Sequence, residues 1–482
     1  MTADAQDNRN PNRTGRAPDV HPLEPFRIKV VEPIRLLSRG EREERLREAG
    51  YNIFNIRAED VIVDLLTDSG TSAMSDRQWG GIMRGDESYA GCRNYGHFVD
   101  TVQQLTGYRH VLPVHQGRAG EHLLFSTILQ PGDVVISNAH FDTTHANVVD
   151  SGATPIDLPD PSCADLDNPY PFKGNIDLDR LDQVLSDHRG RVKLCILTIT
   201  SNTVGGQPVS LANARAAREI LDRHGVPLFF DAARFAENAW FVSQREESET
   251  GRPIREIARA MFDCGDGCLV SAKKDGLANI GGFVAMRDGD LAERLKERMV
   301  VIEGFPTYGG LAGRDLEAVA RGLEEVTDAE YLAYRTGQAA WLGEQLAAAG
   351  ARIVRPVGGH AVFIDAGALY PHIPPQEFPG QTLTVEFYRE GGVRVVEIGS
   401  LMFGAADPVT GTVTPPAHEL VRLAIPRRVY TSSHLQHVIH TFASLYRRRN
   451  TGRGFAIEYQ ARFLRHFTAR LRERPVPATA PV

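Results

Sequence analysis

The sequence predicts an α/β fold with a large, mostly parallel sheet and a second, smaller α+β domain. Between residues 110 and 270, short apolar runs alternate with amphipathic stretches of helical length. The runs are rich in β-branched residues and are bounded by glycine or polar residues. This alternation is typical of βα units, in which the crossover helices cover both faces of the sheet.

The expected elements follow one another along the chain. An extended arm (25–33) precedes a charged helix (39–49) and a strand (61–66), and the sheet strands are then expected at 110–114, 133–137, 193–198, 227–230 and 267–270. Helices are expected between them at 120–128, 177–186 and 211–224. Two long helices (316–326 and 329–349) and strands at 352–356, 360–365 and 421–425 predict the smaller domain.

These patterns divide the chain into five parts. Residues 1–22 and 475–482 are polar or proline-rich and are expected to be disordered tails. Residues 23–66 form the arm and part of the small domain. The large domain spans 67–328, and the small C-terminal domain spans 329–474.

Composition excludes several classes of protein. The net charge of −7 gives no electrostatic reason to expect binding to nucleic acid or to an acidic membrane. No apolar run approaches the roughly 20 residues that cross a bilayer, and the start lacks the apolar region of a secretory signal, so we expect a cytoplasmic protein. The five cysteines lack metal-binding spacing and are expected to be reduced and mostly buried.

Polar residues follow each expected strand, at the sheet edge where ligands of such folds bind. In order they are a glycine-containing turn (115–120), Phe141, Asn202, the pair Asp231 and Arg234, and the segment Ser271-Ala-Lys273-Lys274. A turn into a helix suits a phosphate, an aromatic ring can stack on a planar cofactor, and a lysine can bond to an aldehyde. Each feature alone has an ordinary alternative, such as an exposed basic turn, but their joint order favours a cofactor site.

This order resembles the pyridoxal-phosphate β-eliminating lyases, the group that contains tryptophanase and tyrosine phenol-lyase. The resemblance extends over nearly the whole chain and rests on residues 64–71, 83–91, 115–118, 205–210, 271–275, 308–311 and 356–361. It implies the fold type I of pyridoxal-phosphate enzymes, carbon–carbon lyase activity on an amino acid, and a homotetramer built from dimers with sites at subunit interfaces.

The resemblance also implies roles for individual residues. Lys274 would form the Schiff base with pyridoxal 5′-phosphate, with Lys273 beside it. The phosphate would be bound by Gln116, Gly117, Arg118 and Ser271, and the ring would be contacted by Phe141, Asp231, Asn202 and Arg234. Thr67, Ser69, Tyr308 and Arg422 would bind the substrate, with Arg422 on its carboxylate. A monovalent cation such as potassium would lie near Gly70, Glu87 and Asn279.

Three positions favour tryptophan over tyrosine as the substrate. Asp142 matches tryptophanases, Ile398 stands where phenol-lyases have an arginine, and His466 stands where they have a phenylalanine. The expected reaction is β-elimination to indole, pyruvate and ammonia. Lys274 would remove the α-proton, Tyr89 would act as the general acid, and Asp142 and His466 would contact the indole N–H.

Several alternatives stay open at this point. Tyr89, His466 and Asp142 could instead be a packing tyrosine, a core histidine and a helix cap. His140 and the segment 279–282 depart from the tryptophanase pattern, so a substituted tryptophan, tyrosine or an S-alkyl-cysteine remains a candidate substrate. A pyridoxal-phosphate-binding protein without activity is the non-enzyme alternative. The role of His140 and the choice between tryptophan catabolism and a biosynthetic role are not fixed by the sequence.

Overall fold

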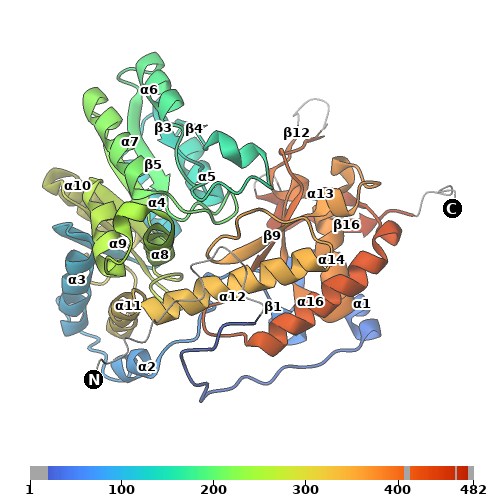
Figure 1. The fold of residues 1–482 in the computed structure, drawn as a ribbon. Helices are drawn as coiled ribbons and strands as arrows, with labels where there is room; N and C mark the ends of the chain where they lie inside the picture. The colour runs from blue at the N-terminus through green and yellow to red at the C-terminus, as the bar shows by residue number, and fades with distance from the viewer. Residues whose placement is uncertain (1–19, 407–412, 462–463, 476–482) are drawn as a thin grey trace, which may run out of the picture.

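A seven-stranded sheet lies at the centre of the computed structural model, which describes residues 20–406, 413–461 and 464–475 (Figure 1). The sheet order is β2-β8-β7-β6-β5-β3-β4, and the strands are His110–Val114 (β2), Val134–Ser137 (β3), Thr154–Asp157 (β4), Val192–Thr198 (β5), Leu228–Asp231 (β6), Gly267–Ser271 (β7) and Gly282–Met286 (β8). Six of these seven strands run in the same direction, and β8 runs in the opposite one. The mostly parallel sheet that the sequence predicts is therefore confirmed.

Helices cover both faces of this sheet because side chains alternate along the buried strands. Val134 and Ile136 belong to the apolar cluster of one face, whereas Val135 belongs to that of the other. The first cluster is completed mainly by Arg93–Thr106 (α3), Leu178–Asp187 (α6), Leu211–His224 (α7), Phe235–Arg245 (α8), Ile254–Asp263 (α9) and Gly313–Glu325 (α11). The second is completed by Gly117–Ile128 (α4), Asp142–Asp150 (α5) and Gly289–Ile302 (α10).

A smaller antiparallel sheet in the order β11-β14-β9 lies in the C-terminal half of the chain. Its strands are Ala361–Asp365 (β9), Val396–Ile398 (β11) and Leu420–Ala424 (β14). The helices Ala329–Ala348 (α12), Pro379–Gly391 (α14) and Ser432–Arg447 (α16) pack beside it around a separate apolar cluster. Helix α12 runs from the large sheet toward this part of the molecule (Figure 1). The expected domain boundaries stay a prediction.

The remaining elements are short or peripheral. They are Arg39–Glu48 (α1), Asp76–Ile82 (α2), Ala366–Leu369 (α13), Ser400–Phe403 (α15), Val63–Asp64 (β1), Val393–Arg394 (β10), Ala405–Ala406 (β12), Val413–Thr414 (β13), Phe455–Tyr459 (β15) and Arg470–Glu473 (β16). Before α1 the chain is extended, with Leu23, Val30 and Val31 more than 80% exposed. Among the described residues no helix is long and apolar enough to cross a membrane.

Two expected strands differ from the structure. Residues 352–356 form only an isolated bridge, Ile353 to Ile364, because Pro356 lacks the N–H that would continue a ladder. The strand expected over 61–66 is limited to β1, which pairs only with the two-residue β10. Three of the five cysteines are buried and all are free thiols, as expected.

A buried ion cluster joins the two sheets. Arg427, which follows β14, donates to Asp68 at 2.9 Å and to Glu237 and Asp275 at 2.8 Å each. Arg335 of α12 donates to Glu237 at 3.0 Å. These side chains are at most 1% exposed. Two arginines from the C-terminal part of the chain are thus matched to carboxylates that precede residue 329, which offsets the desolvation of each group.

We expect Arg427→Met to lower the free energy of unfolding by about 3–5 kcal/mol, because it leaves Asp68, Glu237 and Asp275 buried without their shared cation. Urea denaturation followed by circular dichroism measures this loss.

Arg57→Ala is the matched control, since the pair Arg57–Glu59 is exposed and exposed pairs contribute about 0–1 kcal/mol. Similar small losses in both variants would contradict a structural role for the cluster.

Candidate active site

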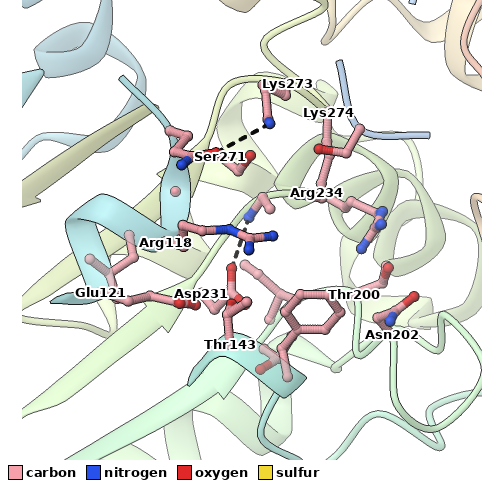
Figure 2. A pocket seen from close by; sticks show the side chains of 18 residues that line it. Arg118, Glu121, Thr143, Thr200, Asn202, Asp231, Arg234, Ser271, Lys273 and Lys274 are labelled. Carbon is pink, nitrogen blue, oxygen red and sulfur yellow. Dashed lines mark hydrogen bonds between the residues drawn. The ribbon is translucent and has the colours of Figure 1, made fainter. Parts of the chain in front are cut away.

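A pocket lies at the carboxyl ends of β2, β3, β5, β6 and β7, the edge at which the sequence predicts a ligand (Figure 2). Its walls come from the segments that follow these strands and from Ser69 in the turn after β1. The parallel direction of the five strands places all of these segments at one edge. Of the expected cofactor residues, the structure brings together Gln116, Gly117, Arg118, Phe141, Asn202, Asp231, Arg234, Ser271, Lys273 and Lys274.

One end of the pocket suits an anion. Gly117 opens α4, and a Cβ at this position would lie 2.7 Å from the Cβ of Ser271. The Lys273 ammonium lies 3.5 Å from Oε1 of Gln116, and Arg118 lines the same end. Backbone N–H groups at the start of a helix, two cations and a hydroxyl together match the charge and donors that a phosphate ester needs.

Lys274 and Asp231 face the middle of the pocket. Burial first, and then the charge of Arg234, lowers the pKa of Lys274 to about 8. Burial raises the pKa of Asp231, whose carboxylate accepts one long hydrogen bond, from the Ala233 N–H at 3.4 Å. No cation among the described residues lies within ion-pair distance of Asp231. A carboxylate held in this way favours a positively charged N–H partner.

Asn202 links the pocket to the smaller sheet. Its Oδ1 accepts from Nε2 of His360 at 2.8 Å and from Nη1 of Arg422 at 3.2 Å, which leaves its amide nitrogen available to donate into the pocket. Thr200, which also lines the pocket, has a buried hydroxyl with no partner. Arg234 instead directs two N–H groups to Asp68, at 2.8 and 3.0 Å.

Arg422 of β14 is an enclosed guanidinium without a carboxylate partner among the described residues. Besides Asn202, it donates to the Leu66 carbonyl at 3.2 Å, and its Nε has no partner. Burial lowers its pKa to about 10. A planar cation in this state is suited to bind a carboxylate through two hydrogen bonds.

The structure places Tyr89 outside the pocket of its own chain. Tyr89 is 70% exposed. The centre of its ring lies 5.2 Å from that of Tyr308 and 5.7 Å from that of Phe305. Glu87 likewise accepts from the N–H groups of Gly313 and Arg314, at the start of α11. The expected general acid and one cation ligand are therefore on the outer surface of this chain.

The other two expected cation ligands do lie together. The amide of Asn279 donates to the carbonyls of Gly70 and Ser72, at 3.0 Å each. Among the described residues, no cluster of three or more histidine, cysteine or carboxylate side chains is arranged to hold a metal ion. Gly70 belongs to the same turn as Thr67 and Ser69. In this turn the Ser69 N–H donates to the Thr67 hydroxyl at 3.1 Å.

The residues expected to determine substrate specificity lie partly beside the pocket and partly away from it. Asp142 opens α5 beside the pocket; burial raises its pKa, and Arg118, Arg422 and Lys274 oppose that rise. Ile398 of β11 packs in an apolar cluster on the smaller sheet. His466 is buried with neither ring nitrogen bonded, and burial lowers its pKa to about 4.

Sequence reasoning missed several residues of this site. Glu121 lines the pocket from α4, and its signal in the sequence is a lone carboxylate in an otherwise apolar helix. His140, whose role the sequence left open, has a buried side chain whose Nδ1 lies 2.7 Å from a carboxylate oxygen of the partly exposed Asp157. The contact between His360 and Asn202 joins residues 158 positions apart and has no local signature.

In the cofactor-free protein, we expect Lys274 to react with an amine-selective acylating reagent with a midpoint near pH 8, because the pKa of its free amine is about 8 rather than the usual ~10.4. Mass spectrometry of the Lys274 peptide across pH measures the rate. The exposed Lys193 serves as the internal control, and a Lys274 midpoint near that of Lys193 would contradict the assignment.

Comparisons with known proteins agree with this geometry. The family model described as "Beta-eliminating lyase" matches residues 64–441. A tryptophanase from Salinibacter ruber is 53% identical over 94% of this chain and 96% of its own length. A tyrosine phenol-lyase from Symbiobacterium thermophilum is 47% identical over 93% of this chain and 98% of its own length.

Solved structures give the same fold. A serine palmitoyltransferase from S. paucimobilis, described with bound PLP-myriocin, matches with a TM-score of 0.55 at 14% identity, over 81% of this chain and 88% of that one. The expected fold type I is thereby confirmed. With the family match and these relatives, the chain belongs to the β-eliminating lyase family and is a lyase enzyme.

Proposed function

We propose that this protein is a pyridoxal-phosphate-dependent lyase that cleaves L-tryptophan to indole, pyruvate and ammonia. One observation supports the amino-acid substrate most directly: Arg422, an enclosed cation without a carboxylate partner in the described parts of the chain, shares Asn202 with the pocket that contains Lys274. An α-carboxylate on Arg422 would thus place its α-carbon toward Lys274.

The residues of the pocket fit pyridoxal phosphate. The phosphate would be held by Gly117, Arg118, Ser271 and Lys273. Glycine is needed at position 117 because a Cβ there would lie 2.7 Å from the Cβ of Ser271. Asp231 would hold the proton on the ring nitrogen. Asn202 would donate to the phenolic oxygen, and the aldehyde would bond to Lys274. When bound, the cofactor supplies a carbonyl that links to amines and a ring that accepts the electron pair left by removal of the α-proton.

The side chains of the chain then move protons at defined atoms. Nζ of Lys274, whose lowered pKa of about 8 makes the neutral amine accessible in mildly alkaline solution, takes the α-proton. Arg422 fixes the carboxylate and so orients the bond to be broken. A Tyr89 hydroxyl donates the proton that C3 of indole gains as the Cβ–C3 bond breaks. Hydrolysis of the three-carbon remainder gives pyruvate and ammonia.

The apolar surroundings of Ile398 support indole over phenol. Ile398 offers no donor or acceptor, so a phenol hydroxyl placed there would lose its hydrogen bonds to water. His466 carries two unbonded nitrogens and is neutral near pH 7, so its ring can accept from the indole N–H. Asp142 is the second acceptor beside the pocket. Tyrosine and S-alkyl-cysteine are the alternative substrates within the family.

A second copy of the chain would complete the site. Tyr89 and Glu87 lie on the outer surface, and Val301, Met83 and Trp79 are exposed apolar residues, at 83%, 79% and 48%. We propose that Tyr89 serves the pocket of a partner subunit within a homotetramer. A Glu87 carboxylate would in the same way join Gly70 and Asn279 around a potassium ion.

We expect the purified protein with pyridoxal phosphate and potassium to release indole from L-tryptophan faster than it releases phenol from L-tyrosine or methanethiol from S-methyl-L-cysteine. Ile398→Arg puts a hydrogen-bond donor where the aromatic ring of the substrate is proposed to lie, and should raise kcat/KM for tyrosine relative to tryptophan at least about tenfold. Phenol released faster than indole by the unaltered enzyme would overturn the substrate assignment.

We expect that mixing subunits of Tyr89→Phe with subunits of Lys274→Met restores activity. If each site takes Lys274 from one chain and Tyr89 from its partner, half of the random dimers have one intact site, so about a quarter of wild-type activity returns. Indole release after dissociation and reassembly measures it. Mixtures as inactive as the separate variants would show that Tyr89 acts within its own chain or not at all.

A further inference from the structure

Glu121 is a pocket-lining carboxyl group for which the proposed reaction has no role. It lies one helical turn after Gly117 on α4 and lines the same pocket as the anion site. Figure 2 shows it in the same pocket as Asp231 and Thr143. The residue is buried, with 6% of its surface exposed. Burial of an unpaired ionised carboxylate is costly, so its charge state must be explained.

The partners of Glu121 are neutral donors. The Thr144 hydroxyl donates to Oε1 at 2.7 Å, and the Asn147 amide donates to Oε2 at 3.4 Å. No lysine, arginine or histidine in the described parts of the chain forms an ion pair with Glu121. These contacts fix the position of the carboxyl group without supplying a positive charge.

Two acidic side chains near Glu121 add to the cost of its negative charge. Asp231 faces it from β6 and Asp142 from α5, and both oppose its ionisation. Burial first, and Asp231 second, raise the pKa of Glu121 to about 7. If Asp231 and Glu121 were both ionised, two negative charges would face the single positive charge of the cofactor's ring nitrogen. The state of lower free energy keeps one of the two carboxyl groups protonated.

We propose that Glu121 is a positioning residue of the cofactor site that acts in its protonated, uncharged form. This inference rests on the proposed function, because it assigns Glu121 a place beside the ring of pyridoxal phosphate. Glu121 packs against the Asp231 side of the pocket and is fixed by Thr144 and Asn147. Its neutral state leaves Asp231 as the single negative charge that the ring nitrogen meets.

The test compares Glu121→Gln, which keeps the shape and the uncharged state, with Glu121→Leu, which removes both acceptors. The readouts are the dissociation constant for pyridoxal phosphate and the pH midpoint of the visible absorbance of the lysine-bound cofactor. Neither readout depends on the substrate, so a wrong substrate assignment leaves this test intact. Asp231→Asn is the reference variant, because it removes a negative charge at the ring.

We expect Glu121→Gln to bind pyridoxal phosphate within about twofold of wild type and to keep the pH midpoint within about 0.3 unit, because no charge is removed. Glu121→Leu should weaken cofactor binding at least about tenfold. Thr144→Val, which removes one donor to Glu121, should weaken it about threefold and guards against a Leu variant that does not fold.

Three results would overturn the inference. A midpoint in Glu121→Gln shifted by about one unit, in the direction of Asp231→Asn, would show that Glu121 is ionised. Wild-type affinity in both Glu121→Leu and Thr144→Val would show that it positions nothing. A wild-type protein that binds no pyridoxal phosphate would overturn the proposed function, and this inference with it.

Discussion

The buried ion cluster around Arg427 is the interaction on which the geometry of the site depends. Asp68 accepts from both Arg234 and Arg427. Burial raises the pKa of Asp68, but the positive charges of Arg234 and Arg427 outweigh burial and hold it well below the usual range. Asp68 also immediately precedes Ser69, which lines the pocket. One carboxylate therefore fixes the turn after β1, the segment after β6 and the segment after β14 relative to one another. Because each member is desolvated, loss of one charge exposes the others to the full cost of burial.

Charges inside this cluster are matched, and charges in the pocket are not. Lys274, Asp231 and Arg422 lack ion-pair partners within the described chain, and their pKa values move toward the neutral form. Lys274, Asp231 and Arg422 are largely removed from water without such partners, so their charged forms are unfavourable before a ligand binds. A zwitterionic substrate and a charged cofactor would supply the missing partners, which favours their binding. The contrast explains why the cluster is structural and the pocket is reactive, although both are built from the same residue types.

The sequence predicted the part of the site that depends on strand ends. Phe141, Asn202, Asp231 and Lys274 each follow an apolar run, and parallel pairing is sufficient to bring such positions to one edge. It could not predict contacts that depend on tertiary packing. The bond from His360 to Asn202 and the sharing of Asp68 by two arginines join segments that are distant in sequence. The expected strand at 352–356 was wrong because only Ile353 pairs with β9 and Pro356 lacks the N–H that would extend the ladder.

The position of Tyr89 connects the chemistry of the site to the assembly of the protein. Its motif predicts a general acid, yet its exposure places it away from the Lys274 of the same chain. A tyrosine that must protonate a carbon has to lie within hydrogen-bond reach of it in the working complex. If Tyr89 is the general acid, the Lys274 that it works with belongs to another subunit. The role proposed for one residue thus constrains the assembly proposed for the enzyme.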